Sequence, residues 1–131
     1  MFRPRLIPVL LLKNNVLVKS VKFKNYNYIG DPINAVKIFN EKEVDELIFL
    51  DISAREAAGP NLRLLKDIAS ETFMPLAYGG GITKIKQIEE LFKLGIEKVI
   101  LNTESFLNPQ LIQDAVSISG AQSIVASIDV K

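Results

Sequence analysis

Five short apolar runs recur along the chain and are separated by segments with helical periodicity. Runs without polar alternation are typical of strands buried on both faces, so they predict a parallel sheet covered by helices. The runs lie at residues 6–12, 47–50, 76–78, 99–101 and 123–128. Residues 16–23 alternate apolar and polar side chains instead, which indicates a hairpin or an extended excursion after the first strand.

Helix signals lie between these runs. Asp31-Pro32 and Asn108-Pro109 each place a capping side chain before a proline at the first helical position. Thr83 is placed to cap a helix over residues 84–94, which Gly95 ends. A similar apolar stripe follows Pro60-Asn61. The resulting order, βαβαβαβαβ with short connections, predicts right-handed crossovers and an α/β fold.

The composition excludes several kinds of chemistry without identifying one. The 131 residues carry a net charge of +1, are 48% hydrophobic, and include neither Cys nor His. One domain of this length has a sufficient core, and no basic patch points to nucleic acid. Without Cys or His there is no thiol nucleophile, no Ser-His-Asp triad and no imidazole metal ligand. Acid–base chemistry would fall to carboxylates, Lys or Tyr, and we expect no cofactor and no metal.

The beginning of the chain resembles a secretory signal only superficially. Arg3 and Arg5 precede the first apolar run, but Lys13-Asn14-Asn15 follows it without a small-residue cleavage site. No segment approaches the roughly 20 apolar residues that a membrane-spanning helix needs. We therefore expect a soluble, cytoplasmic protein that does not bind membranes.

Polar groups follow the predicted strands, at the edge where parallel α/β proteins bind ligands. They are Asp51, Gly79-Gly80-Gly81, Asn102-Thr103 and Asp129. The three glycines before a helix would let the backbone approach an anion, and the amide and hydroxyl follow the next strand, so together they predict a phosphate site. The alternatives are a tight turn that merely tolerates glycine, and an Asp51 that only caps its own turn. A dinucleotide site is disfavoured because the G-x-G-x-x-G spacing is missing.

Three charged residues occupy the opposite ends of the strands. Arg5, Glu46 and Lys98 each lie just before an apolar run. Charges at such positions usually face solvent, and the alternative is an ion-pair ring of mixed sign.

The motifs, in order and spacing, resemble the cyclase subunit of imidazole glycerol phosphate synthase over essentially all 131 residues. The matching segments are Gly30-Asp31-Pro32 and residues 47–52, 78–82, 101–103 and 126–129. The resemblance implies a (βα)8 barrel of about twice this length. This chain matches its first four βα units and its fifth strand, so residues 1–131 would be an N-terminal half-barrel.

That family joins ammonia from a glutaminase partner to a phosphoribulosyl-formimino intermediate of histidine biosynthesis, giving imidazole glycerol phosphate. The resemblance implies that Gly81, Asn102 and Thr103 hold a substrate phosphate, and that Lys19 and Asp51 line the active site. It also implies that Arg5, Glu46 and Lys98 form an ammonia gate facing the glutaminase. Asp129 matches one of the two aspartates that act as general acid and base.

The other aspartate is replaced by Leu11, which neither accepts nor donates a proton. The segment Leu10-Leu11-Leu12-Lys13 also resembles that of a branch of the family. That branch delivers ammonia for acetamidino-sugar formation in surface-polysaccharide biosynthesis. A phosphate-binding module without turnover is a further alternative. Because a half-barrel leaves apolar strand edges open, we expect the isolated chain to be catalytically silent and either to pair with itself or to belong to a longer chain.

Overall fold

The computed structural model describes residues 4–21, 25–54, 59–102 and 108–126. The strands are β1 (Val9–Lys13), β2 (Val16–Val21), β3 (Asn25–Gly30), β4 (Leu47–Asp51), β5 (Leu76–Gly79), β6 (Lys98–Leu101) and β7 (Ile124–Ala126). The helices are α1 (Pro32–Glu41), α2 (Leu62–Glu71), α3 (Ile85–Lys93), α4 (Pro109–Ser119) and the 3-10 turn η2 (Ala121–Ser123). In these ranges no helix is both long and apolar enough to span a membrane.

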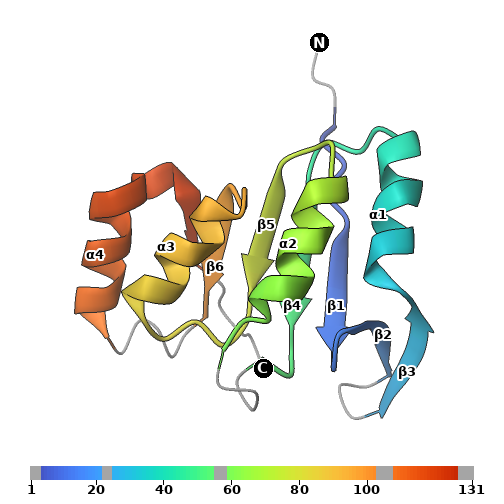
Figure 1. The fold of residues 1–131 in the computed structure, drawn as a ribbon, viewed down its shortest axis with the longest axis horizontal. Helices are drawn as coiled ribbons and strands as arrows, with labels where there is room; N and C mark the ends of the chain where they lie inside the picture. The colour runs from blue at the N-terminus through green and yellow to red at the C-terminus, as the bar shows by residue number, and fades with distance from the viewer. Residues whose placement is uncertain (1–3, 22–24, 55–58, 103–107, 127–131) are drawn as a thin grey trace.

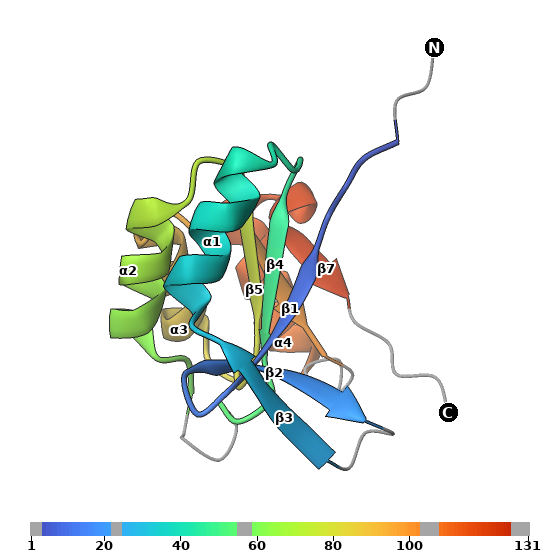
Figure 2. The same ribbon diagram turned by 90° about the vertical axis from the view of Figure 1, so that its right-hand side faces the viewer.

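The strands form one mixed sheet in the order β3-β2-β1-β4-β5-β6-β7. Strands β1, β4, β5, β6 and β7 run parallel, which confirms the predicted α/β class. The chain adds a strand on one side of the sheet each time it passes through a helix (Figure 1). The β2–β3 hairpin is antiparallel to β1 and projects beyond the parallel strands (Figure 2).

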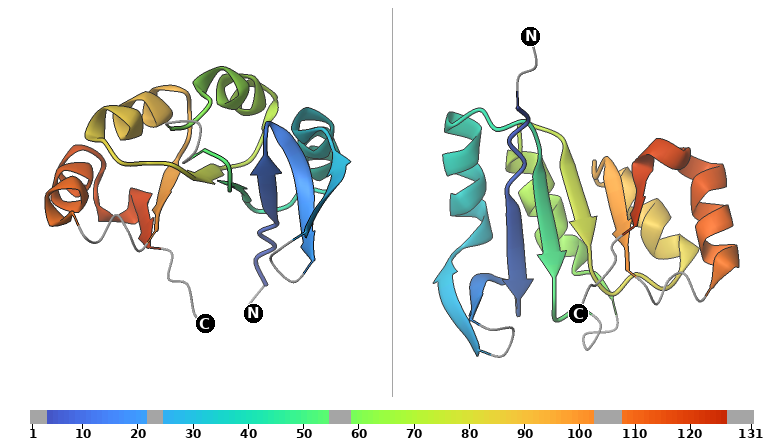
Figure 3. Two further views of the ribbon diagram at one scale, coloured as in Figure 1. Left: turned by 90° about the horizontal axis from the view of Figure 1, so that it is seen from below. Right: turned by 180° about the vertical axis from the view of Figure 1, so that it is seen from behind.

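The helices lie on one face of the sheet, and the sheet curves away from them like part of a barrel wall (Figure 3). The burial of β4 alternates accordingly, because Leu47 and Phe49 are buried whereas Ile48 and Leu50 are half-buried. Helical cover of one face is the arrangement of the (βα)8 barrel that the family resemblance implies. On the second, concave face, the half-buried Ile48 and Leu50 of β4 are apolar as well, as expected of a barrel interior.

Two predicted strands differ from the observed ones. The first begins at Val9 rather than residue 6, because Leu6 exchanges hydrogen bonds with Asp45 and Pro8 has no N–H to donate. The last is Ile124–Ala126, preceded by η2, and the remainder of the predicted run lies outside the described residues. The predicted excursion after the first strand is confirmed as β2, which pairs with β3.

The β1–β2 connection is a two-residue turn made by Asn14 and Asn15. Both have positive φ, 51° and 69°, which is the backbone conformation of a type I′ hairpin turn. Asparagine tolerates this conformation better than most residues. The sequence Asn-Asn therefore fixes the sharp reversal that places β2 against β1.

Three of the predicted helix starts are confirmed. The side chains of Asp31 and Asn108 accept the amides of Asn34 and Leu111, at 3.1 and 3.3 Å. Asn61 caps α2 in the same way. Each cap satisfies an amide that has no partner inside its own helix, so the local sequence alone determines where these helices begin.

The predicted Thr83 cap was wrong. Oε1 of Gln87 accepts the amides of Thr83 and Lys84, at 2.8 and 3.1 Å, so a side chain inside the helix reaches back and α3 begins at Ile85. The predicted end at Gly95 is confirmed. Gly95 has a φ of +103° and donates its amide to Phe92, as expected of a helix-terminating glycine.

Candidate functional site

The parallel strands bring most of the predicted ligand groups to one edge of the sheet. Asp51 ends β4, the glycine turn of residues 79–81 begins in β5, and Asn102 follows β6. These three strands are neighbours in the sheet. Thr103 and Asp129, the other two predicted groups of this edge, lie outside the described residues.

Asp51 is buried and is held by its own loop. Its Oδ1 accepts the amide and the hydroxyl of Ser53, at 2.9 and 2.8 Å. Oγ of Ser53 in turn accepts the amide of Asn14 at 2.9 Å. A buried carboxylate needs such hydrogen-bond partners. The contacts of Oδ1 therefore agree with the alternative that Asp51 caps its own turn.

A polar pocket of about 310 Å³ opens beside Asp51. Asn15 and Asn61 also line it, and Nδ2 of Asn61 donates to Oδ1 of Asn15 at 2.9 Å. The hairpin turn is thereby joined to the start of α2. The predicted placement of Asp51 at a ligand-accessible edge agrees with this geometry, and its contact with substrate stays a prediction.

The glycine turn is packed tightly against the loop that follows β4. A Cβ on Gly80 would lie 2.5 Å from the carbonyl oxygen of Asp51, and one on Gly81 would lie 2.8 Å from the backbone of Ala54. Both residues also have positive φ, +142° and +63°. The fold itself therefore requires glycine at these two positions, whatever the turn binds.

The amides around this turn are not equivalent. Those of Thr83 and Lys84, at the start of α3, are already bound by Gln87. The amide of Gly81 donates no hydrogen bond to any residue that the structure describes. The amide that could donate to a ligand is therefore that of Gly81 in the glycine turn rather than those at the start of α3, and the anion site itself stays a prediction.

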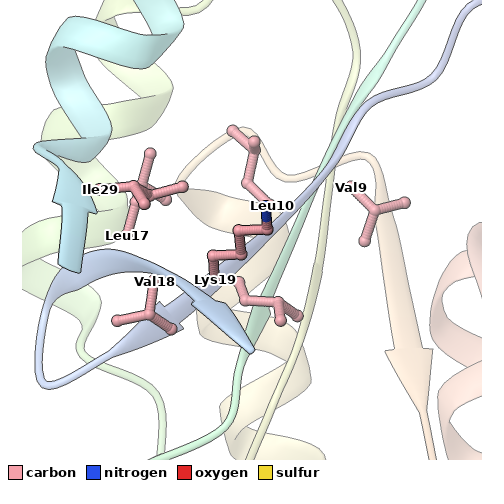
Figure 4. Close-up of a pocket in the computed structure, with 7 residues that line it drawn as sticks. Val9, Leu10, Leu17, Val18, Lys19 and Ile29 are labelled. Atoms are coloured by element: carbon pink, nitrogen blue, oxygen red, sulfur yellow. The ribbon is translucent and has the colours of Figure 1, made fainter. Parts of the chain in front are cut away.

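Lys19 lies in a different place from Asp51 and the glycines. It lines a pocket of about 290 Å³ together with Leu11 and other aliphatic side chains. Its side chain extends from β2 toward Leu10 of β1 (Figure 4). Lys19 and Leu11 thus line the same pocket, and Leu11 is apolar where the family that this chain resembles has an aspartate.

The charged residues at the opposite edge meet in one cluster. Nη2 of Arg5 and Nζ of Lys98 each lie 2.9 Å from a carboxylate oxygen of Glu46, one cation on each oxygen. The side chain of Glu46 is 8% exposed, whereas that of Arg5 is 64% exposed. Solvent-facing charges were the expectation from position alone, and that expectation was wrong for Glu46. The ion-pair alternative is confirmed for these three residues.

Three further residues of the site escaped the sequence analysis. Ser53 positions Asp51, Gln87 occupies the start of α3, and Tyr78 lies beneath the glycine turn with its hydroxyl 3.2 Å from the carbonyl oxygen of Gly80. The spacing from Lys84 to Gln87, three residues, was the available signal for Gln87. In the described part of the chain, no group of three or more acidic residues is placed to hold a metal ion.

A model of the histidine biosynthesis protein family matches residues 5–131. The chain belongs to this family.

Curated relatives agree with this assignment. A Pseudomonas aeruginosa protein, provisionally named imidazole glycerol phosphate synthase subunit hisF2, is 54% identical over 98% of this chain and 52% of the relative. A Vibrio vulnificus protein, provisionally named as subunit hisF3, is 54% identical over 100% of this chain and 51% of the relative. The Thermococcus onnurineus imidazole glycerol phosphate synthase subunit HisF is 39% identical over 100% of this chain and 52% of the relative. The chain spans about half the length of the curated relatives it matches.

For this family member, we expect the Glu46 cluster to contribute measurably to stability. Glu46→Gln would leave Arg5 and Lys98 facing each other without their shared anion, and we expect a loss of about 1–3 kcal/mol in the free energy of unfolding. Denaturant titration measures it. Glu97→Gln, which removes an exposed charge one residue before β6, is the control and should change stability by less than about 0.5 kcal/mol. Equal effects of the two substitutions would contradict this expectation.

Proposed function

We propose that this chain forms the N-terminal half of a cyclase subunit of imidazole glycerol phosphate synthase. The subunit uses ammonia from a glutaminase on a phosphoribulosyl-formimino substrate and gives imidazole glycerol phosphate. The observation that carries the proposal is the buried Glu46, which Arg5 and Lys98 both hold at the edge of the sheet where β4 and β6 begin. A charged cluster at one end of an apolar face and ligand groups at the other fit a subunit that receives ammonia at one edge and uses it at the other.

The ligand edge supports binding of a phosphorylated substrate. The glycine turn presents the amide of Gly81, and the polar residues of Asn102-Thr103 follow the adjacent strand. Backbone amides and hydroxyls are the hydrogen-bond donors that commonly bind phosphate groups in α/β proteins. In the proposed site Gly81, Asn102 and Thr103 hold the phosphate, and Asp129 transfers protons.

We expect Thr103→Val to weaken phosphate binding by about tenfold, because it replaces a hydroxyl donor by a methyl group of similar size. Titration of the folded chain with inorganic phosphate, followed by nuclear magnetic resonance, measures the affinity. Thr72→Val makes the same replacement at the opposite edge of the sheet, before β5, and should leave the affinity unchanged. Equal affinity in the Thr103 variant and the unmodified chain would count against the phosphate site.

The glutaminase is proposed to dock at the edge that carries the Glu46 cluster. Phe73 lies at this edge, in the connection from α2 to β5, and is 85% exposed. Asn40 fixes the connection, because its side chain accepts the amide of Phe73 at 3.0 Å and donates to the carbonyl of Glu71 at 2.7 Å. A rigidly presented, exposed aromatic side chain is typical of a residue that anchors a protein partner.

Phe73→Ser should therefore weaken binding to the glutaminase subunit of the same organism by at least about tenfold, with little change in stability. Calorimetric titration measures the affinity. Tyr28→Ser removes another exposed aromatic side chain, on the β2–β3 hairpin, and should leave it unchanged. If the two substitutions had the same effect on affinity, the proposed docking edge would be wrong.

Leu11 favours a second candidate function. It lies within the apolar pocket that Lys19 also lines, and it pairs with Leu50 in β4, so no carboxylate replaces the missing aspartate there. A subunit with this pocket would still conduct ammonia while lacking one of the two proton-transfer groups. We propose it as the alternative: a cyclase-like subunit that delivers ammonia to an amidotransferase in acetamidino-sugar formation.

The two functions differ in the effect of restoring the carboxylate. In a protein that carries this chain at the full length of its relatives, Leu11→Asp should raise ammonia-dependent cyclase turnover by about 10²- to 10⁴-fold, because a positioned acid or base contributes that much. Leu50→Asp places a carboxylate on the neighbouring strand and should not raise it. Turnover typical of a histidine-pathway cyclase with Leu11 in place would instead refute the alternative.

A further inference from the structure

Tyr78 is a buried aromatic residue directly before the three glycines. It is 1% exposed, and its hydroxyl donates to the carbonyl oxygen of Gly80 at 3.2 Å. A buried tyrosine hydroxyl needs a polar partner, and here the partner is the backbone two residues further along the chain. The ring packs in the core while its polar end reaches the base of the glycine turn.

A run of glycines has no fixed backbone conformation of its own, because residues without a Cβ populate many regions of φ and ψ. The close approach of Gly80 to the carbonyl of Asp51 and of Gly81 to the backbone of Ala54, which leaves no room for a Cβ, limits where this turn can pass. It leaves open how the peptide plane between Gly80 and Gly81 is rotated. The hydrogen bond from Tyr78 sets that rotation, since it holds the Gly80 carbonyl toward the buried hydroxyl.

The orientation of this carbonyl determines that of the next amide. The peptide is trans, so the N–H of Gly81 points in the direction opposite to the carbonyl of Gly80. It therefore points away from Tyr78 and the core. Within the described part of the chain, this N–H has no acceptor.

We propose that Tyr78 is a positioning residue, whose hydroxyl locks the Gly80–Gly81 peptide so that the Gly81 amide faces a phosphate group of the ligand. The inference rests on the phosphate site of the proposed function and assigns the residue that orients it. Tyr78 does not touch the ligand and acts only through the backbone.

The surroundings keep the hydroxyl in its donating form. Burial, and to a lesser extent the neighbouring Asp51 carboxylate, raises the pKa of Tyr78 well above its ordinary value. The hydroxyl therefore stays protonated across the range in which proteins function. Its hydrogen bond to Gly80 is insensitive to pH there.

The test compares phosphate affinity in Tyr78→Phe and in the unmodified chain. The substitution removes one hydroxyl and keeps the ring. The turn therefore retains its packing but loses the hydrogen bond that orients the Gly80–Gly81 peptide. We expect phosphate affinity, measured by titration with inorganic phosphate, to fall by about tenfold, because the Gly81 amide is no longer held toward the phosphate. Tyr28→Phe, at a tyrosine that is 66% exposed, is the matched control and should not change it.

A second measurement keeps the hydroxyl and does not depend on how Tyr78→Phe folds. In a chain labelled with 3-fluorotyrosine, the fluorine resonance of Tyr78 should shift when phosphate binds, because the hydrogen bond to Gly80 tightens. The resonance of Tyr28 should stay in place.

The outcomes separate this inference from the proposed function. Equal phosphate affinity in Tyr78→Phe and the unmodified chain, or an unmoved Tyr78 resonance on binding, would overturn the role of Tyr78 alone. Failure of the unmodified chain to bind phosphate would overturn the phosphate site together with the inference. A tenfold loss confined to Tyr78→Phe, with a shifted Tyr78 resonance, would support both.

Discussion

Two buried carboxylates bracket the central strand β4, and the surrounding structure is arranged to accommodate them. Glu46 precedes the strand and Asp51 ends it, and they are the buried charged residues in the part of the chain that the structure describes. An uncompensated buried carboxylate is strongly unfavourable. Cations from two other parts of the chain compensate Glu46, and a serine two residues away compensates Asp51.

The two ends of β4 are therefore fixed by different means. The Glu46 end depends on residues 41 and 52 positions away in the sequence, so it forms only when the sheet is assembled. The Asp51 end is largely local and joins the β1–β2 turn through Ser53. A single strand thus connects a charged edge with a ligand edge, and its length sets the distance between them.

This difference explains how much could be predicted from the sequence. Local signals succeeded: Asp31 and Asn108 begin helices, Gly95 ends one, and the apolar runs form the strands. The start of α3 was misplaced because the long side chain of Gln87 competes with the short one of Thr83 for the same amides. The Glu46 cluster joins residues that are 41 and 52 positions apart, so it depends on the assembled sheet and no local spacing predicts it. The family resemblance, by contrast, rested on strand-end motifs, of which the fold places Asp51, residues 79–81 and Asn102 on neighbouring strands.

The order of the strands has a consequence for how the chain folds during synthesis. From β4 onward, each new strand pairs with the strand made just before it, or, for β4, with β1. Every unit of strand and helix can therefore dock on a surface that already exists when it leaves the ribosome. Chains grow more slowly than such units form, at roughly 5–20 residues per second. The sheet is thus suited to assemble unit by unit in the direction of translation.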